Sequence, residues 1–93
     1  MREKEIEQKL VRAVKNQGGM CPKLVCPGVN GMPDRMVLMP GRHIAFVEVK
    51  APGKKPRPLQ VMRHKQLRQL GFQVHVLDDP EQIPGILQEA EHE

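Results

Sequence analysis

Apolar residues along the chain recur at two different spacings, and each spacing predicts a type of secondary structure. Within residues 2–17 they recur three or four positions apart, which is typical of a helix, until Gly18-Gly19 ends the run. The apolar positions of this helix are Ile6, Leu10, Ala13 and Val14. Short apolar runs bounded by glycine, proline and polar residues predict four strands, at 21–25, 36–39, 44–50 and 72–77.

The segment between the third and fourth predicted strands is expected to consist of a loop followed by a helix. Residues 51–58 are rich in proline, glycine and basic side chains and predict an extended loop. Pro58 is a favourable first residue for a helix, and Gly71 is expected to cap its end. The predicted inward face of this helix consists of Leu59, Met62, Gln66 or Leu67, and Leu70. A last helix is predicted to start at 78–80, with an interruption at Pro84 and with apolar Ile83, Ile86, Leu87 and Ala90.

These elements have the order α-β-β-β-α-β-α, which predicts an α/β fold in a single domain over residues 1–93. A chain of this length buries only about 60–65% of its surface, so a homodimer is an expected source of additional stability. No apolar stretch approaches the roughly 20 residues of a membrane span, and the charged residues 1–5 do not resemble a signal peptide. We therefore expect a cytoplasmic protein with no membrane partner, in which Cys21 and Cys26 are reduced thiols.

Basic residues outnumber acidic ones by 15 to 11, and the net charge of +4 favours a polyanionic partner. Within the predicted loop, Lys54, Lys55 and Arg57 are expected to contact DNA phosphates without sequence preference. Arg35 is expected to pair with an acid or with phosphate, and the sequence does not decide between them. Further positive charge is predicted along the following helix, from Arg63, His64, Lys65 and Arg68. No aromatic residues are interspersed among these cations, which favours duplex or branched DNA over single strands.

Two short segments, 31–35 and 47–50, place acidic residues and a lysine on one predicted β-hairpin. Pro40-Gly41-Arg42 is a turn signal between the two strands. If Gly41 is at the centre of the turn, Asp34 lies directly across from Glu48 and on the same face. Lys50 shares that face because it is two residues after Glu48. Two acids and a lysine in an otherwise apolar hairpin point to a divalent metal beside a scissile phosphate.

Phosphodiester hydrolysis requires charge neutralisation, an activated water and a stabilised leaving oxygen. Asp34 and Glu48, together with the backbone carbonyl of Val49, offer the hard oxygen ligands that Mg²⁺ or Mn²⁺ prefers. Lys50 is predicted to orient or deprotonate the water, or to neutralise charge in the transition state. In the alternative interpretation, Asp34 opens a turn and Glu48 and Lys50 form an exposed ion pair. The presence of all three in register on one hairpin favours the catalytic interpretation.

The first predicted helix supplies a further candidate metal ligand and catalytic acid, Glu7, which falls within the apolar stripe. A carboxylate in that position is costly unless it is paired or metal-bound. Glu3, one turn earlier, remains an alternative, and both could instead be solvated acids that complement the helix dipole. Gln60 opens the second helix and is predicted to meet Lys50, a ligand water or phosphate, with a surface glutamine as the alternative. The histidines show no metal-binding spacing and are interpreted as structural or surface residues: His43, His64, His75 and His92.

Together these motifs resemble a known family. Pro33-Asp34 followed by Glu48-Val49-Lys50 resembles the PD-(D/E)XK nuclease signature. The wider string resembles a stand-alone VRR-NUC domain: 31–35, 46–50, the run ending at Gln60, and 67–76. The resemblance implies a restriction-endonuclease-like fold, with a mixed β-sheet flanked by helices, and hydrolysis dependent on Mg²⁺ or Mn²⁺. It also implies metal ligation by Asp34 and Glu48, a catalytic Lys50, and roles for Glu7 as the helix-1 acid and for Gln60.

Small members of this family are similar to Holliday-junction resolvases, which work as homodimers. The resemblance therefore implies a structure-selective DNA endonuclease of a phage or bacterial cell, acting on branched DNA such as four-way junctions. Three alternatives remain open from the sequence. The chain could cut flapped, nicked or plain duplex DNA, it could be a catalytically silent DNA-binding module, or it could be a small basic adaptor for other repair proteins.

Overall fold

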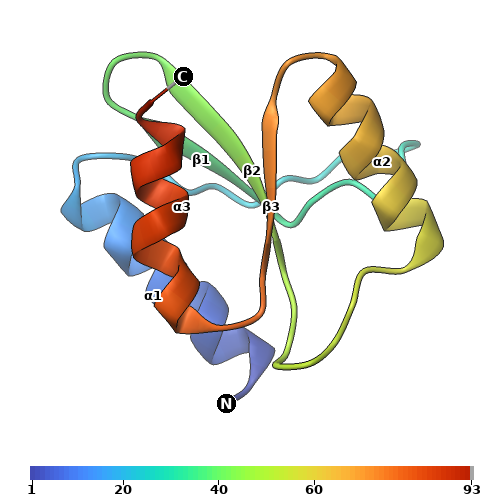
Figure 1. Ribbon diagram of the computed structural model, residues 1–93, viewed down its shortest axis with the longest axis horizontal. Helices are drawn as coiled ribbons and strands as arrows, with labels where there is room; N and C mark the ends of the chain where they lie inside the picture. The colour runs from blue at the N-terminus through green and yellow to red at the C-terminus, as the bar shows by residue number, and fades with distance from the viewer. Residues whose placement is uncertain (93) are drawn as a thin grey trace.

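The computed structural model describes residues 1–92, and within them a three-stranded sheet carries helices on both faces (Figure 1). Helices α1 and α3 lie together on one face of the sheet, and α2 lies on the other. In chain order the elements are α1 (Glu3–Asn16), β1 (Arg35–Met39), β2 (His43–Val49), α2 (Pro58–Gln69), β3 (Gln73–Leu77), the 3₁₀ turn η1 (Pro80–Gln82) and α3 (Ile83–Ala90). The predicted α/β class and the predicted order of elements are confirmed, except that the first predicted strand is reduced to isolated bridges.

The sheet is mixed, with β2 in the centre of the order β1-β2-β3. β1 and β2 form an antiparallel hairpin in which Met39 pairs with His43, so Gly41 is at the centre of the turn as predicted. Gly41 and Arg42 both adopt positive φ, at 89° and 69°, a conformation that glycine reaches without a steric penalty. β2 and β3 run parallel, and α2 supplies the crossover that a parallel connection requires.

Two apolar layers cover the sheet and leave β2 buried on both sides. The larger layer joins α1 and α3 to the sheet and includes Ile6, Leu10, Val14, Val37, Val47, Val49, Leu77, Ile83, Ile86, Leu87 and Ala90. The smaller layer, beneath α2, is built around Phe46, Leu67 and Val74. Because both faces of β2 are covered, every residue from Ala45 to Val49 is buried, and this run includes the charged residue Glu48.

The strand predicted at 21–25 does not form. The segment runs beside β1 as an extended edge with two isolated bridges, Met20 to Leu38 and Lys23 to Arg35. Pro22 accepts a hydrogen bond from the Met36 N–H through its carbonyl but has no N–H to donate in return. The ladder is therefore interrupted where a regular strand would need a donor.

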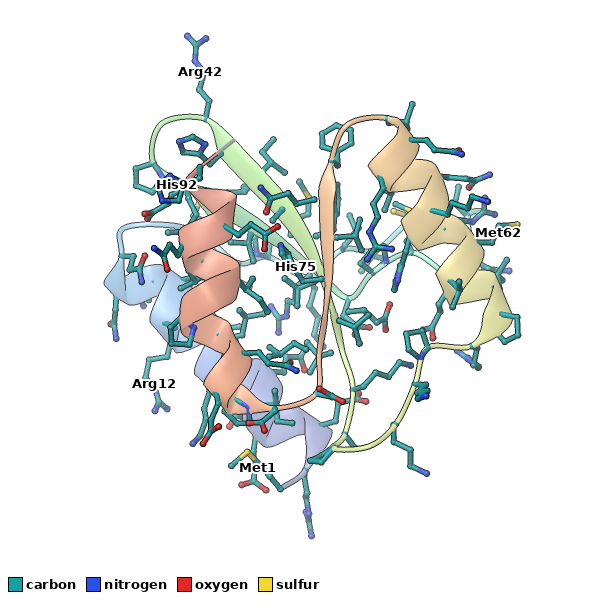
Figure 2. All side chains as sticks on the ribbon, in the orientation of Figure 1. Met1, Arg12, Arg42, Met62, His75 and His92 are labelled. Atoms are coloured by element: carbon teal, nitrogen blue, oxygen red, sulfur yellow. The ribbon has the colours of Figure 1, made fainter. Side chains whose placement is uncertain are left out.

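The predicted inward face of α2 is correct at Leu67 but wrong at Leu59, Met62 and Leu70, because the helix is rotated about its axis. The buried residues of this helix are Gln60, His64 and Leu67, whereas Leu59 and Met62 are more than 40% exposed. Figure 2 shows Met62 pointing away from the sheet. The rotation places two polar side chains against buried Glu48, so polar contacts determine the phase of this helix.

The C-terminal segment differs from its prediction in two ways, at its start and at Pro84. The η1 turn precedes α3, and the Asp79 side chain accepts a hydrogen bond from the Glu81 N–H to begin that turn. Pro84 lies in the first turn of α3, where a missing N–H has no cost, so it does not interrupt the helix. Within residues 1–92, no helix has both the length and the apolar character of a membrane span.

Candidate active site

The predicted acids and lysine meet at the carboxyl end of β2. Continuing the hairpin register one residue beyond β1 places Asp34 opposite Glu48, on the face of the sheet that α2 covers. Asp34 Oδ2 accepts a hydrogen bond of 2.7 Å from the Val49 N–H, which ties the start of β1 to the end of β2. The Lys50 Nζ atom lies 3.8 Å from Glu48 Oε2. The structure thus brings together Asp34, Glu48 and Lys50 as the sequence predicts.

Two side chains of α2 contact the carboxylate of Glu48, one at each oxygen. Gln60 Nε2 donates to Glu48 Oε2 at 3.2 Å, and His64 Nε2 lies 3.4 Å from Glu48 Oε1. Gln60 also accepts a hydrogen bond from the Arg57 N–H at 2.9 Å, so it caps α2 and contacts Glu48 at once. Gln60 therefore reaches the site, through Glu48 rather than through Lys50.

The carboxyl group of Glu48 is costly to ionise in the metal-free protein. Burial, followed by the hydrogen bond and the charge of Asp34, raises the pKa of Glu48 to about 8, and Lys50 only partly opposes this. With this pKa, Glu48 carries a proton at neutral pH, which relieves its repulsion with Asp34. A bound cation would relieve the same repulsion with both acids ionised, so the electrostatics of the site suit a cation.

The donor set suits Mg²⁺ or Mn²⁺ better than it suits zinc. Within residues 1–92, no group of three or more His, Cys, Asp or Glu side chains could hold a metal ion, whereas structural zinc sites need four such ligands. Mg²⁺ is commonly held by one or two carboxylates and keeps several waters. Asp34 and Glu48 lie opposite each other at the end of β2, so two carboxylates are available there, and metal ligation by them and by the backbone carbonyl of Val49 stays a prediction.

His64 was interpreted from the sequence as a structural or surface residue, and its contact with Glu48 in this site was not predicted. It is 2% exposed, and burial, followed by the charges of Arg68 and Lys50, lowers its pKa. Because its side chain is buried against Glu48, His64 does not extend the exposed positive charge along α2, so that part of the prediction is wrong. Its position four residues after Gln60, on the same helical face, was the available signal.

The two acids of α1, Glu7 and Glu3, lie in different surroundings. Arg35 Nε donates to Glu7 Oε2 at 2.9 Å, and Arg35 Nη1 donates to the Cys21 carbonyl at 2.8 Å. The structure thus pairs Arg35 with an acid. Glu3 is exposed, yet its charge contributes to the raised pKa of Glu48.

Both helix-1 acids still border the site. They line a cavity of about 300 Å³ together with Asp34 and five residues of the adjoining segments: Lys23, Leu24, Val25, Met32 and Pro33. Glu7 is thus close enough to share this cavity with Asp34, while its carboxylate is held by Arg35. Its role as a metal ligand stays a prediction, and Glu3 stays the alternative.

The basic loop joins β2 to α2 directly beside the site. Lys54, Lys55 and Arg57 are exposed. A second cavity, of about 470 Å³, lies next to Gln60 and is lined by Asn30, Gly31, Arg57, Pro58, Leu59 and Gln60. Positive side chains and an open cavity beside the acids are the surroundings that a phosphate backbone needs.

Comparisons with known proteins assign this α/β fold to a class of nuclease domains. The chain matches no family model. A solved structure described as a VRR_NUC domain superimposes with a TM-score of 0.87 at 29% identity, covering 95% of this chain and 97% of the other. The protein named "Putative nuclease p44", from Acyrthosiphon pisum secondary endosymbiont phage 1, is 51% identical over 78 residues, or 84% of each chain. The chain therefore belongs to the VRR-NUC family of nuclease domains.

Proposed function

We propose that the protein hydrolyses phosphodiester bonds in DNA with the help of Mg²⁺ or Mn²⁺. The observation that carries this proposal is the buried carboxyl of Glu48 beside Asp34 and Lys50 at the end of β2. An apolar sheet accommodates the buried acid Glu48 beside the half-buried Asp34 at a cost, and metal binding would offset that cost. Membership of a nuclease family supports the same reaction.

The roles follow from the chemistry of each group. Asp34, Glu48 and the carbonyl of Val49 would hold the metal, and Glu7 or Glu3 would add a further oxygen from α1. When bound there, the ion would supply neutralisation of the phosphate charge and a lowered pKa of a water molecule. The ammonium group of Lys50, 3.8 Å from Glu48, orients the attacking water or neutralises charge that develops on the phosphate. Gln60 keeps Glu48 in place through its hydrogen bond to Oε2.

DNA approaches across the basic loop. Lys54, Lys55 and Arg57 are exposed immediately after the strand that carries Glu48, so they contact phosphates flanking the scissile one. Arg35 is less suited to this role, because its guanidinium group already donates to Glu7 and to the Cys21 carbonyl.

The substrate we propose is branched DNA such as a four-way junction, cut by a homodimer. Resemblance to junction resolvases supports this choice of substrate. The small core of a 93-residue chain supports the homodimer, because a second copy adds stability. A homodimer also supplies two active sites for paired incisions. Flapped, nicked or plain duplex DNA is the alternative substrate.

The test is cleavage of a labelled panel with Mg²⁺, Mn²⁺ or EDTA. The panel contains a four-way junction, a flap, a linear duplex and a single strand. Paired, metal-dependent incisions in the junction are expected, together with a dimeric mass in solution. Metal-dependent cutting of the other substrates alone would keep the nuclease and remove the junction preference. Binding without cutting under every metal would leave a DNA-binding module.

The variants Asp34→Ala and Glu48→Ala separate catalysis from binding. Both are expected to abolish cleavage while DNA binding persists or strengthens, because each removes a negative charge close to phosphate. Lys9→Ala is the matched control, since Lys9 is an exposed residue of α1. Cleavage by folded Asp34→Ala at the wild-type rate would contradict the proposed role of this acid.

A further inference from the structure

His64 is a buried polar residue that the proposed reaction does not yet use. It comes from α2 and is 2% exposed. Its Nε2 atom lies 3.4 Å from Glu48 Oε1, while Gln60 donates to the other oxygen, Oε2. The two side chains are four residues apart, so one face of α2 contacts both oxygens of the same carboxylate.

Packing alone does not account for this residue. A buried imidazole costs free energy unless its polar atoms are hydrogen-bonded, and an apolar side chain such as that of Leu67 would fill the layer without that cost. The rotation of α2 that buries His64 also leaves Leu59 and Met62 exposed. Among residues 1–92, no buried side-chain nitrogen or oxygen lacks a hydrogen-bond partner, and the polar contact that the structure gives the His64 side chain is the one with Glu48.

We propose that His64 is a positioning residue that orients the Glu48 carboxylate for metal binding; this inference rests on the proposed metal-dependent nuclease function. When Glu48 is ionised to bind a metal, its carboxylate only accepts hydrogen bonds, so the positioning role requires His64 Nε2 to carry the proton and donate to Oε1. Each carboxylate oxygen has two lone pairs. With one donor from α2 on each oxygen, lone pairs remain free for a cation. A carboxylate that is hydrogen-bonded at both oxygens loses little rotational freedom when the metal binds. This preorganisation raises the affinity for the metal.

The test compares Mn²⁺ affinity, measured by calorimetry on the metal-free protein, in His64→Leu and His64→Gln. Leucine removes the donor, and glutamine retains an N–H donor at a similar reach. Loss of such a supporting contact costs about 10–100-fold in metal affinity or activity. We expect that loss for His64→Leu and a value within about threefold of wild type for His64→Gln.

The matched control is His75→Leu. His75 is a half-buried histidine of β3 that hydrogen-bonds Gln73. Its partner across the sheet is Val47, so it lies on the opposite face from Glu48. The melting temperature of each metal-free variant separates lost stability from lost affinity. If His64→Leu does not fold, His64→Asn takes its place, because asparagine is polar but too short to reach Glu48.

The outcomes separate this inference from the nuclease proposal. Weak Mn²⁺ binding by the folded donor-free variant, restored by His64→Gln and unchanged in His75→Leu, supports the positioning role. Wild-type affinity in the donor-free variant, or a loss that glutamine does not restore, would overturn it. If Asp34→Ala and Glu48→Ala still bind Mn²⁺ and cut DNA like wild type, the proposed metal site itself fails.

Discussion

Replacing Glu48 by glutamine changes how the stability of the metal-free protein depends on pH. In the folded protein the pKa of Glu48 is raised to about 8 from an ordinary value of 4.5, first by burial and then by Asp34. The folded state therefore binds this proton more tightly than the unfolded state does. For a raised carboxyl pKa, stability is greatest below pH 4.5 and falls as pH rises to about 8.

The magnitude follows from the same two pKa values. A tenfold difference in proton affinity between the folded and unfolded states corresponds to about 1.36 kcal/mol, so a rise in pKa from 4.5 to about 8 amounts to at most about 5 kcal/mol. That is a large share of the roughly 5–15 kcal/mol that stabilises an ordinary domain. Glutamine has a similar shape and carries no charge, so Glu48→Gln avoids the loss. The variant is expected to match wild type near pH 5 and to be several kcal/mol more stable at pH 9.

The assay is urea unfolding in EDTA at pH 5, 7 and 9. Subtracting the free energy of unfolding of wild type from that of Glu48→Gln at each pH removes the contributions of other titrating groups. Adding Mg²⁺ at pH 9 should stabilise the wild type, because the metal binds the ionised carboxylates of the native state. It should not stabilise Glu48→Gln to the same extent. Parallel stability curves for the two proteins between pH 5 and pH 9 would refute the reasoning, because Glu48 would then titrate normally in the fold.

Two further predictions concern the basic loop and the loop packed on α2. Lys54→Ala with Lys55→Ala should weaken binding to every DNA substrate and reduce the slope of log affinity against log salt by about 2, with exposed Lys15→Ala as control. An unchanged salt slope would show that Lys54 and Lys55 do not contact DNA phosphates. Gly31→Ala should cost about 1–3 kcal/mol more than Gly53→Ala in urea unfolding. Both glycines have positive φ, but of the two only Gly31 would bring an added Cβ to 2.8 Å from an atom of α2. Equal losses in the free energy of unfolding for the two variants would contradict this packing.

Local signals in the sequence were sufficient for the hairpin. The turn residues centred on Gly41 determine its register, and the register alone places Asp34 opposite Glu48 and Lys50 on the same face. The start of α2 at Pro58 and the apolar face of α3 were likewise readable, because a helical first turn and a helical stripe depend on nearby residues. The juxtaposition of the acids and lysine was therefore predictable, while their catalytic roles remain proposals.

Contacts between distant segments were not readable in this way. The strand predicted at 21–25 failed because its pairing depended on Pro22, which cannot donate to β1. Glu7 was correctly expected to need a partner, but the choice of Arg35 rests on a contact across 28 residues of chain.

The sequence by itself determined the three helical segments, the hairpin with its register, the last strand and the family to which the chain is similar, but not the fate of segment 21–25. These properties depend on residue types at short separations, where turn chemistry and apolar periodicity act directly. Only the tertiary structure decided the rotation of α2, which buries Gln60 and His64 and exposes apolar Leu59 and Met62. Hydrophobic periodicity predicted the other face, because it takes no account of a buried carboxylate on a neighbouring strand. Once Glu48 lies in the interior it must be hydrogen-bonded, and that requirement outweighs the burial of a few apolar side chains.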